Sequence, residues 1–482
     1  MVTAITLQNE LGTMGNIDRS WPAKCMYIAS ALLPSFLHKY TPFSQEMPQY
    51  HYESLPQQAH RQDTCFLDGM RGLAALCVFL EHLLLPFWKD IFYAYGSSKD
   101  SSNLLQLPIV QLLYSGSPMV CIVFIISGIA LSLKPARLAR EGEWQDFYKS
   151  LSSMAFRRGI RLFAPCLLAS FAHMIMAQAG WSGIQSAVPW EGPPEIVDEF
   201  WLKQPEHLPS LLTQLSQWVH FFVDKVVIPS TWRGTSISGR DYGDLEHVEY
   251  GSQLWTVGIE YWSSLVLFTV LLGTADVRLV FKMIIITTSA GFSLCISRWD
   301  VALFLYGCLL GHLDSLQPSP KVHRNRVWEH IIFGLLFCLG LHIASFPELG
   351  GPQTPSFSWL PFNGNSRLWQ SVGASLIVLC SVKLVALRNA FSHHVLLYLG
   401  RISFAIYITH VPLLGTIGWR IFAFVITSLG WETYLAQLGG GIISLSVLVP
   451  IQIWVADIFC RFVDEPCNNL ATRVYSYSTT ST

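Results

Sequence analysis

Long apolar runs separated by polar links dominate the sequence from residue 66 onward. Most of them have the roughly 17–25 residues that an α-helix needs to cross the hydrocarbon core of a membrane. The runs are 66–88, 106–133, 155–179, 254–274, 279–297, 299–314, 328–346, 370–388, 395–418 and 433–461. This pattern predicts an all-α, polytopic membrane protein with about ten transmembrane helices.

The polar stretches divide the chain into regions. We expect residues 1–65 to form a polar cytoplasmic tail that includes a short interfacial segment near Met26–Phe36. Residues 66–466 are expected to form the membrane domain, with a long loop at 180–253. Residues 467–482 are expected to form a short polar tail.

Composition supports the membrane class. The 482 residues are 51% hydrophobic and only 13% charged, whereas soluble domains carry about 25% charged residues. The net charge of −1 excludes a basic nucleic-acid binder.

Several of the eleven cysteines fall in apolar runs, where we expect packing rather than disulfides. These are Cys77, Cys121, Cys166, Cys308, Cys338 and Cys380. We find no metal-ligand spacing and predict no metal site.

The distribution of basic residues predicts the orientation. The link between the second and third runs is strongly basic, and the positive-inside rule places it in the cytoplasm. Its basic residues are Lys134, Arg137, Arg140, Lys149, Arg157, Arg158 and Arg161. A second basic link lies at 321–326. Four predicted runs separate the two links, so both lie on the same side of the membrane. Both termini are then cytoplasmic and the acidic loop 180–253 is lumenal, and we expect the endoplasmic reticulum or another endomembrane.

Two ionisable residues inside the first run are the strongest functional signal. Arg71 and His82 are eleven residues apart, almost three helical turns, so both lie on one helix face about 16 Å apart. Ionisable groups at membrane depth are costly and are candidates for function. His82 suits general acid–base chemistry, and the alternative is a histidine hydrogen-bonded to a neighbouring helix. Arg71 suits an anion, with Asp68 as its ion-pair partner, and the alternative is snorkelling to the interface.

Three further arginines begin the third run. Arg157, Arg158 and Arg161 suit a phosphate-rich ligand at a cytoplasmic mouth, and the alternative is topological anchoring. Within the second run, Ser127 and Gly128 allow close helix packing or the passage of a ligand chain, and packing is favoured. We see no base adjacent to Ser127 in the sequence.

Two more titratable residues fall at the predicted depth of His82. Glu260 lies near the start of the run at 254–274, and His410 lies in the outer half of the run at 395–418. We therefore expect His82, Glu260 and His410 to lie at similar depth on the lumenal side.

These elements resemble the motifs of the acyltransferase-3 family of integral membrane O-acyltransferases. The resemblance runs in order across residues 62–466 and has six elements. They are Leu67-Asp68-Gly69-Met70-Arg71-Gly72 through His82, Phe124-Ile125-Ile126-Ser127-Gly128, Phe156 to Pro165, Trp255 to Glu260, Ser403-Phe404 through Tyr407 to His410, and Asp464-Glu465-Pro466. Ile125 replaces a usual phenylalanine.

The resemblance implies an acyltransferase that moves an acyl group, usually acetyl, from acyl-coenzyme A to a hydroxyl. Acyl-CoA would be a co-substrate, with no tightly bound cofactor. His82 would be the general base, with Glu260 or His410 orienting it. The substrate-binding residues would be Arg71, Ser127, Arg157, Arg158, Arg161, Trp255 and Tyr407.

The acceptor expected by analogy with short fungal members is a small molecule, such as one of secondary metabolism. Two alternatives stay open at the level of sequence. One is acylation of a cell-surface carbohydrate. The other is a proton-coupled transporter, since carriers also place Arg, His and Glu within the membrane; we find no internal repeat of the kind that carriers often show.

Overall fold

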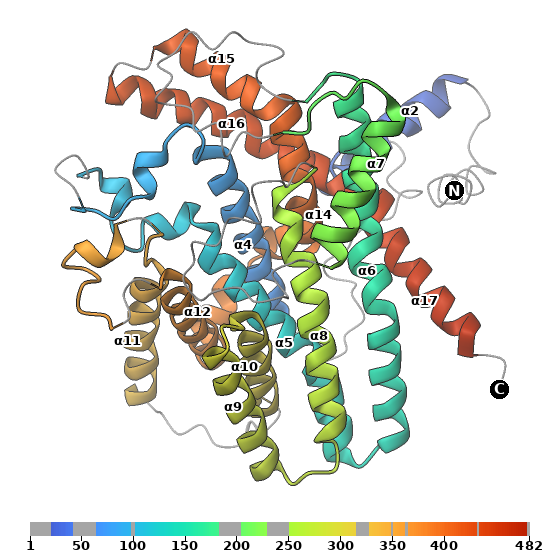
Figure 1. The fold of residues 1–482 in the computed structure, drawn as a ribbon, viewed down its shortest axis with the longest axis vertical. Coiled ribbons are helices and arrows are strands. Elements are labelled where there is room, and N and C mark those ends of the chain that lie inside the picture. The colour runs from blue at the N-terminus through green and yellow to red at the C-terminus, as the bar shows by residue number, and fades with distance from the viewer. Residues whose placement is uncertain are drawn as a thin grey trace.

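Helices make up the fold throughout the residues that the structure describes (Figure 1). The structure is a computed structural model, and it describes residues 21–41, 64–97, 102–182, 204–228, 250–314, 327–348, 350–361, 365–430 and 433–479. No strand occurs among these residues. The predicted all-α class is therefore confirmed. Most of the predicted lumenal loop and the basic link at 321–326 lie outside the described residues.

Each predicted apolar run overlaps one long helix. The helices are α4 (Cys65–Leu84), α5 (Gly116–Glu141), α6 (Trp144–Gln178), α8 (Trp255–Gly273), α9 (Leu279–Cys295), α10 (Trp299–Asp314), α11 (Val327–Ala344), α12 (Ser366–Lys383), α14 (His394–Leu413) and α16 (Tyr434–Phe459). Shorter elements connect or flank them. These are α2 (Trp21–Ala31), α7 (Leu211–Phe221), α13 (Val385–Phe391), α15 (Trp419–Leu429) and α17 (Glu465–Thr479), with π-helical turns Phe222–Val227, Leu414–Gly418 and Cys460–Asp464.

Six helical stretches in the described residues are long and apolar enough to cross a membrane. They are Gly116–Glu141, Trp144–Gln178, Ser252–Gly273, Val327–Ala344, His394–Leu429 and Leu435–Thr479. A seventh is added if α12 and α13, which meet at 101°, form one bent span. The predicted count of ten is not confirmed, since α9 and α10 are shorter apolar helices. The helix α4 is not among the six either, and its 20 residues include the charged Asp68, Arg71 and Glu81.

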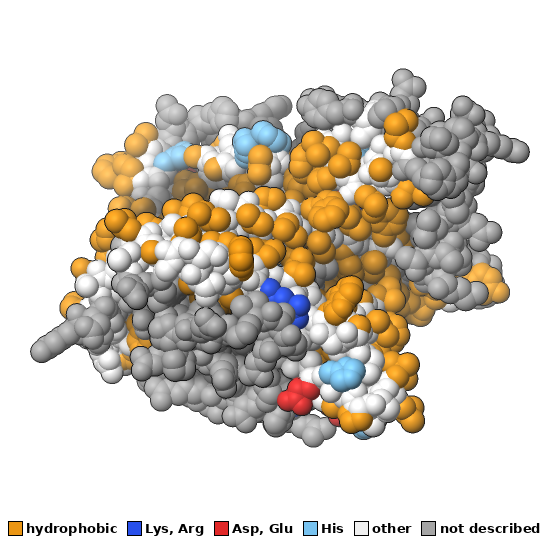
Figure 2. Space-filling view, turned by 90° about the horizontal axis from the view of Figure 1, so that it is seen from above, with side chains coloured by type: hydrophobic (Ala, Val, Ile, Leu, Met, Phe, Trp, Pro, Cys, Tyr) orange, Lys and Arg blue, Asp and Glu red, His pale blue; other side chains and the backbone are white. Residues whose placement is uncertain are grey.

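The surface is that of a multi-pass membrane protein. Hydrophobic side chains cover much of the described surface in Figure 2, and few charged side chains are visible on that face. On α9 and α11 large apolar side chains point outward, including Val280, Phe292, Trp328 and Leu335, each more than 60% exposed. In water such surface would be unfavourable, whereas lipid tails accommodate it.

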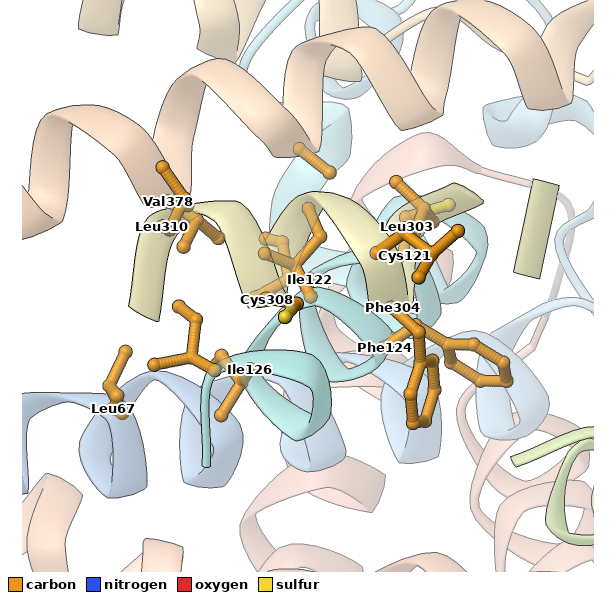
Figure 3. Packing of buried hydrophobic residues seen from close by; sticks show 14 of the residues in the cluster. Leu67, Cys121, Ile122, Phe124, Ile126, Leu303, Phe304, Cys308, Leu310 and Val378 are labelled. Atoms are coloured by element: carbon orange, nitrogen blue, oxygen red, sulfur yellow. The ribbon is translucent and has the colours of Figure 1, made fainter. Parts of the chain in front are cut away.

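Glycines let the central helices approach closely. A methyl group on Gly128 of α5 would meet the backbone of Phe304 on α10, so the expected packing role of Gly128 is confirmed. Figure 3 shows the resulting core, with Phe124 of α5 beside Phe304 of α10. Small residues at such crossings are typical of membrane helices.

A second close crossing joins α4 to α14. A methyl group on Gly72 would meet the backbone of Leu399 and Gly400, and one on Gly400 would meet the backbone of Asp68. The two helices therefore touch backbone to backbone beside Arg71. This crossing fixes which α14 residues the Arg71–His82 face of α4 can meet.

The two predicted tails contain helical elements. The N-terminal segment docks through Ser35, whose backbone N–H and hydroxyl both donate to the buried carboxylate of Asp457 at 3.0 and 2.7 Å. At the other end, α17 extends through the predicted polar tail to Thr479 and contacts α6. The ten described cysteines are free thiols. Of the six named above, all but the exposed Cys338 are buried.

Gly72→Ala should lower the thermal midpoint of the purified protein, because the added methyl group pushes α4 away from α14. Overpacking of this kind costs about 1–3 kcal/mol. The matched control is Gly334→Ala on α11, where nothing lies within 4 Å of the added methyl group. That control should leave the midpoint unchanged or raise it slightly. Equal midpoints for the two variants would contradict the close crossing.

Candidate active site

Arg71 faces α14 and is held by two partners. Its Nη2 forms an ion pair with Asp68 Oδ1 at 2.9 Å, so the expected partner is confirmed. Its Nε donates to Ser403 Oγ on α14 at 3.2 Å. The guanidinium stays partly exposed. It therefore presents a fixed positive charge that water or a ligand can reach.

His82 meets His410 at the other end of the α4 face. The two ring centroids lie 5.0 Å apart with an interplanar angle of 49°. His82 is partly exposed, whereas His410 is fully buried. Arg71 and His82 thus both face α14, as the eleven-residue spacing predicts.

The hydrogen bonding of His410 determines its tautomer. Its Nδ1 lies 3.1 Å from the carbonyl oxygen of Ile406. Because a carbonyl oxygen only accepts, Nδ1 carries the proton, and in the neutral ring Nε2 keeps its lone pair. Among the described residues, this buried Nε2 has no hydrogen-bond partner. It is an acceptor available to an N–H or O–H group in the site.

Tyr407, one turn before His410, connects α14 to the start of α8. Its hydroxyl donates to the carbonyl oxygen of Gln253 at 2.6 Å and lies 2.5 Å from Thr256 Oγ1. The side chain of Gln253 returns a hydrogen bond to the Ile408 carbonyl at 2.9 Å. Trp255, the first residue of α8, is therefore held near this junction and remains partly exposed.

Glu260 does not join the two histidines in direct contact. Its Oε1 instead forms an ion pair with Arg158 Nη2 at 2.6 Å and accepts a hydrogen bond from Ser127 Oγ at 3.0 Å. The side chains of Arg158 and Glu260 are only 10% and 16% exposed. The interpretation that no base lies beside Ser127 is wrong, although that carboxylate is already occupied by Arg158. Depth alone could not identify this partner.

Two of the three arginines on α6 converge with Arg71. Arg161 interacts electrostatically with Arg158, Arg71, Asp464 and Glu260. It is accessible to solvent although protein surrounds it. Three guanidiniums therefore share the space with three carboxylates, because Asp68 pairs with Arg71. The fork geometry of arginine suits phosphate groups.

Arg157 points away from this group. Its Nε donates to the Ser153 carbonyl at 3.1 Å, and its Nη1 lies 3.3 Å from Thr472 Oγ1 on α17. Arg157 was predicted to bind the same ligand as Arg158 and Arg161, but the structure directs its side chain elsewhere. It also brings in Asp464, which was not predicted as a site residue. The acidic motif that contains Asp464 was the available signal.

Comparison with known proteins identifies the family. Residues 66–453 match the family described as acyltransferase domain, Acyl_transf_3. The chain is 31% identical over 424 residues to "O-acetyltransferase PaAT-1" of Phomopsis amygdali, which covers 83% of this chain and 82% of that protein. It is 25% identical to "Acyltransferase clz18" of Cochliobolus lunatus, and 23% identical to "Acyltransferase R4" of a Phoma species. Each of these two matches covers 86% of this chain and 96% of the relative.

No solved structure matches the fold significantly. The family match spans most of the chain and contains Arg71, His82, the Glu260 ion pair and His410. The chain therefore belongs to the Acyl_transf_3 family and is a multi-pass membrane acyltransferase.

Proposed function

We propose that the protein transfers an acetyl group from acetyl-CoA to a hydroxyl of a small-molecule acceptor. The observation that carries the proposal is the placement of two different groups along one face of α4. Arg71 lies with the other arginines at one end, and His82 lies against His410 at the other. The Phomopsis relative is named as an O-acetyltransferase, which supports acetyl as the acyl group.

Acyl-CoA is the co-substrate, and the arginine end binds it. Arg71, Arg158 and Arg161 would contact its phosphates from the cytoplasmic side, with both termini on that side. The pantetheine arm, about 15–20 Å when extended, would carry the thioester toward His82. The eleven residues from Arg71 to His82 span about 16 Å. The distance therefore fits the arm, and no tightly bound cofactor is needed.

His82 acts as the general base in this scheme. It removes the proton of the acceptor hydroxyl while the oxygen attacks the thioester carbonyl, and the C–S bond then breaks. The imidazolium returns its proton to the leaving thiolate. His410 orients the ring, because its Nε2 lone pair can accept a hydrogen bond from an N–H of His82. Glu260 anchors Arg158 and Ser127 rather than the imidazole, and no acyl-enzyme is required.

The acceptor is proposed to be a small molecule of secondary metabolism, with the enzyme in the endoplasmic reticulum or another endomembrane. The three relatives named above support this only through their fungal origin. Family membership favours the enzyme over a proton-coupled transporter. No contact among the described residues favours a carbohydrate acceptor.

His82→Ala should reduce turnover by about 10²- to 10⁴-fold, because the general base is lost. Binding of CoA, measured by its effect on the thermal midpoint, should persist. The matched control is His220→Ala, whose side chain is 79% exposed on α7, and it should keep wild-type turnover. Wild-type turnover in His82→Ala would reject the mechanism.

Arg161→Gln should raise the KM for acetyl-CoA by roughly 10- to 100-fold, since a charge-assisted hydrogen bond is worth ~1.5–3 kcal/mol. Acetyl-pantetheine lacks the nucleotide phosphates, so its kinetics should be nearly the same in the variant and the wild type. Arg157→Gln, which removes an arginine directed at α17, should have a much smaller effect. If Arg161→Gln impaired both donors equally, the assignment of Arg161 to the phosphates would be wrong.

A further inference from the structure

A group of aromatic rings lies near Tyr407 and the start of α8. Its centre is Trp299, the first residue of α10. The Trp299 ring lies 6.4 Å from that of Trp255 and 5.2 Å from that of Phe124, and Arg367 Cζ lies 5.0 Å from its centroid. We refer to Trp255, Trp299 and Phe124 as the Trp299 platform. Three helices supply its rings, and Arg367 of α12 supplies the cation.

The platform adjoins the histidine pair. Arg367 interacts electrostatically with Glu81, the neighbour of His82, and with Tyr407, whose ring centroid lies 5.8 Å from that of His410. Thr256, the neighbour of Trp255, is the hydroxyl that meets Tyr407. The platform is thus connected to the histidines through both α12 and α8.

The tryptophan rings are not fully covered by protein. Trp255, Trp299, Tyr407 and Arg367 are each partly exposed, in contrast to the fully buried His410. Aromatic rings with an accessible surface next to a reactive group offer a large contact area for an apolar molecule.

Three polar side chains next to the platform, Arg367, Tyr407 and Glu81, already have partners within the protein. Arg367 Nη1 donates to the Ser117 carbonyl at 3.0 Å, and the Tyr407 hydroxyl is bound to Gln253 and Thr256. The Glu81 carboxylate accepts a hydrogen bond from the backbone of Gly116. A bound carbohydrate loses hydrogen bonds to water and needs several protein groups to replace them. An apolar ring system needs only an apolar surface to pack against.

We propose that the Trp299 platform binds the body of the acceptor, and that the acceptor is a predominantly apolar, polycyclic alcohol. This proposal rests on the acyl-transfer function proposed above. Its ring system packs on Trp255 and Trp299 while its hydroxyl reaches His82. Arg367 is a positioning residue, because its guanidinium lies over Trp299 and donates a hydrogen bond to the Ser117 carbonyl at the start of α5.

The test is a series of secondary alcohols of increasing ring number, with acetyl-CoA as donor and the full-length protein in nanodiscs. The probes are 2-propanol, cyclohexanol and 2-decalol, with methyl glucoside as the polar comparison. For the wild type, kcat/KM should rise at least about tenfold from cyclohexanol to 2-decalol, as burial of the added methylenes predicts. Methyl glucoside should be the poorest cyclic acceptor.

Trp299→Ala should remove most of this rise and leave the rate with 2-propanol close to that of the wild type. Trp299→Leu is the second variant, and it should show the same loss of the rise if Trp299→Ala does not fold. Trp328→Ala, on a side chain 76% exposed on α11, is the matched control and should retain the full rise. Arg367→Gln should raise the KM for 2-decalol about tenfold with little change in kcat, which a purely structural defect would not do.

A flat series in the wild type, or a preference for methyl glucoside over 2-decalol, would overturn the proposal. Failure of the proposed function looks different, since then none of the alcohols would be acetylated. In that case calorimetric titration of 2-decalol decides the matter. At least tenfold weaker binding to Trp299→Ala than to wild type would support the platform as a binding site, and equal affinities would reject it.

Discussion

The backbone contact between α4 and α14 is the constraint on which the site depends. Gly72 and Gly400 permit it, because a side chain at either position would collide with the other helix. With the helices this close, the α4 face that carries Arg71 and His82 is directed toward α14. Ser403 then binds Arg71, and His410 meets His82. The two ends of the site are therefore positioned by one crossing, and the distance between them follows from the rise of α4.

A buried ion pair provides the second constraint. Arg158 and Glu260 join α6 to α8, and Ser127 adds α5 through the same carboxylate oxygen. Removing one member of such a pair leaves the other charge unpaired in a low-dielectric environment, which typically costs 3–5 kcal/mol. The pair thus fixes three helices, α5, α6 and α8, relative to one another. It explains why Glu260 lies close to the site without contacting His82.

Much of the fold could be predicted from the sequence, because apolar length and periodicity depend on local residues. Each predicted run became a helix, and the spacing of Arg71 and His82 correctly placed them on one face. The partners were harder to predict, since depth in the membrane does not specify which helix lies opposite. Glu260 was grouped with the histidines by depth but binds Arg158. Trp299 and Arg367 were missed because their significance comes only from helix packing.

The contrast between the two ends bears on how transfer can prevail over hydrolysis. A thioester held among charged, solvated side chains would meet water as readily as an alcohol. His410 is fully buried, and beside His82 the α4 residues Phe79 and Leu83 pack in an apolar core. Exclusion of water from the reacting atoms suppresses side reactions and strengthens polar interactions there. In the proposed scheme, the same separation would let a polyanionic donor and an apolar acceptor approach from environments that suit each, so that they would meet at the imidazole.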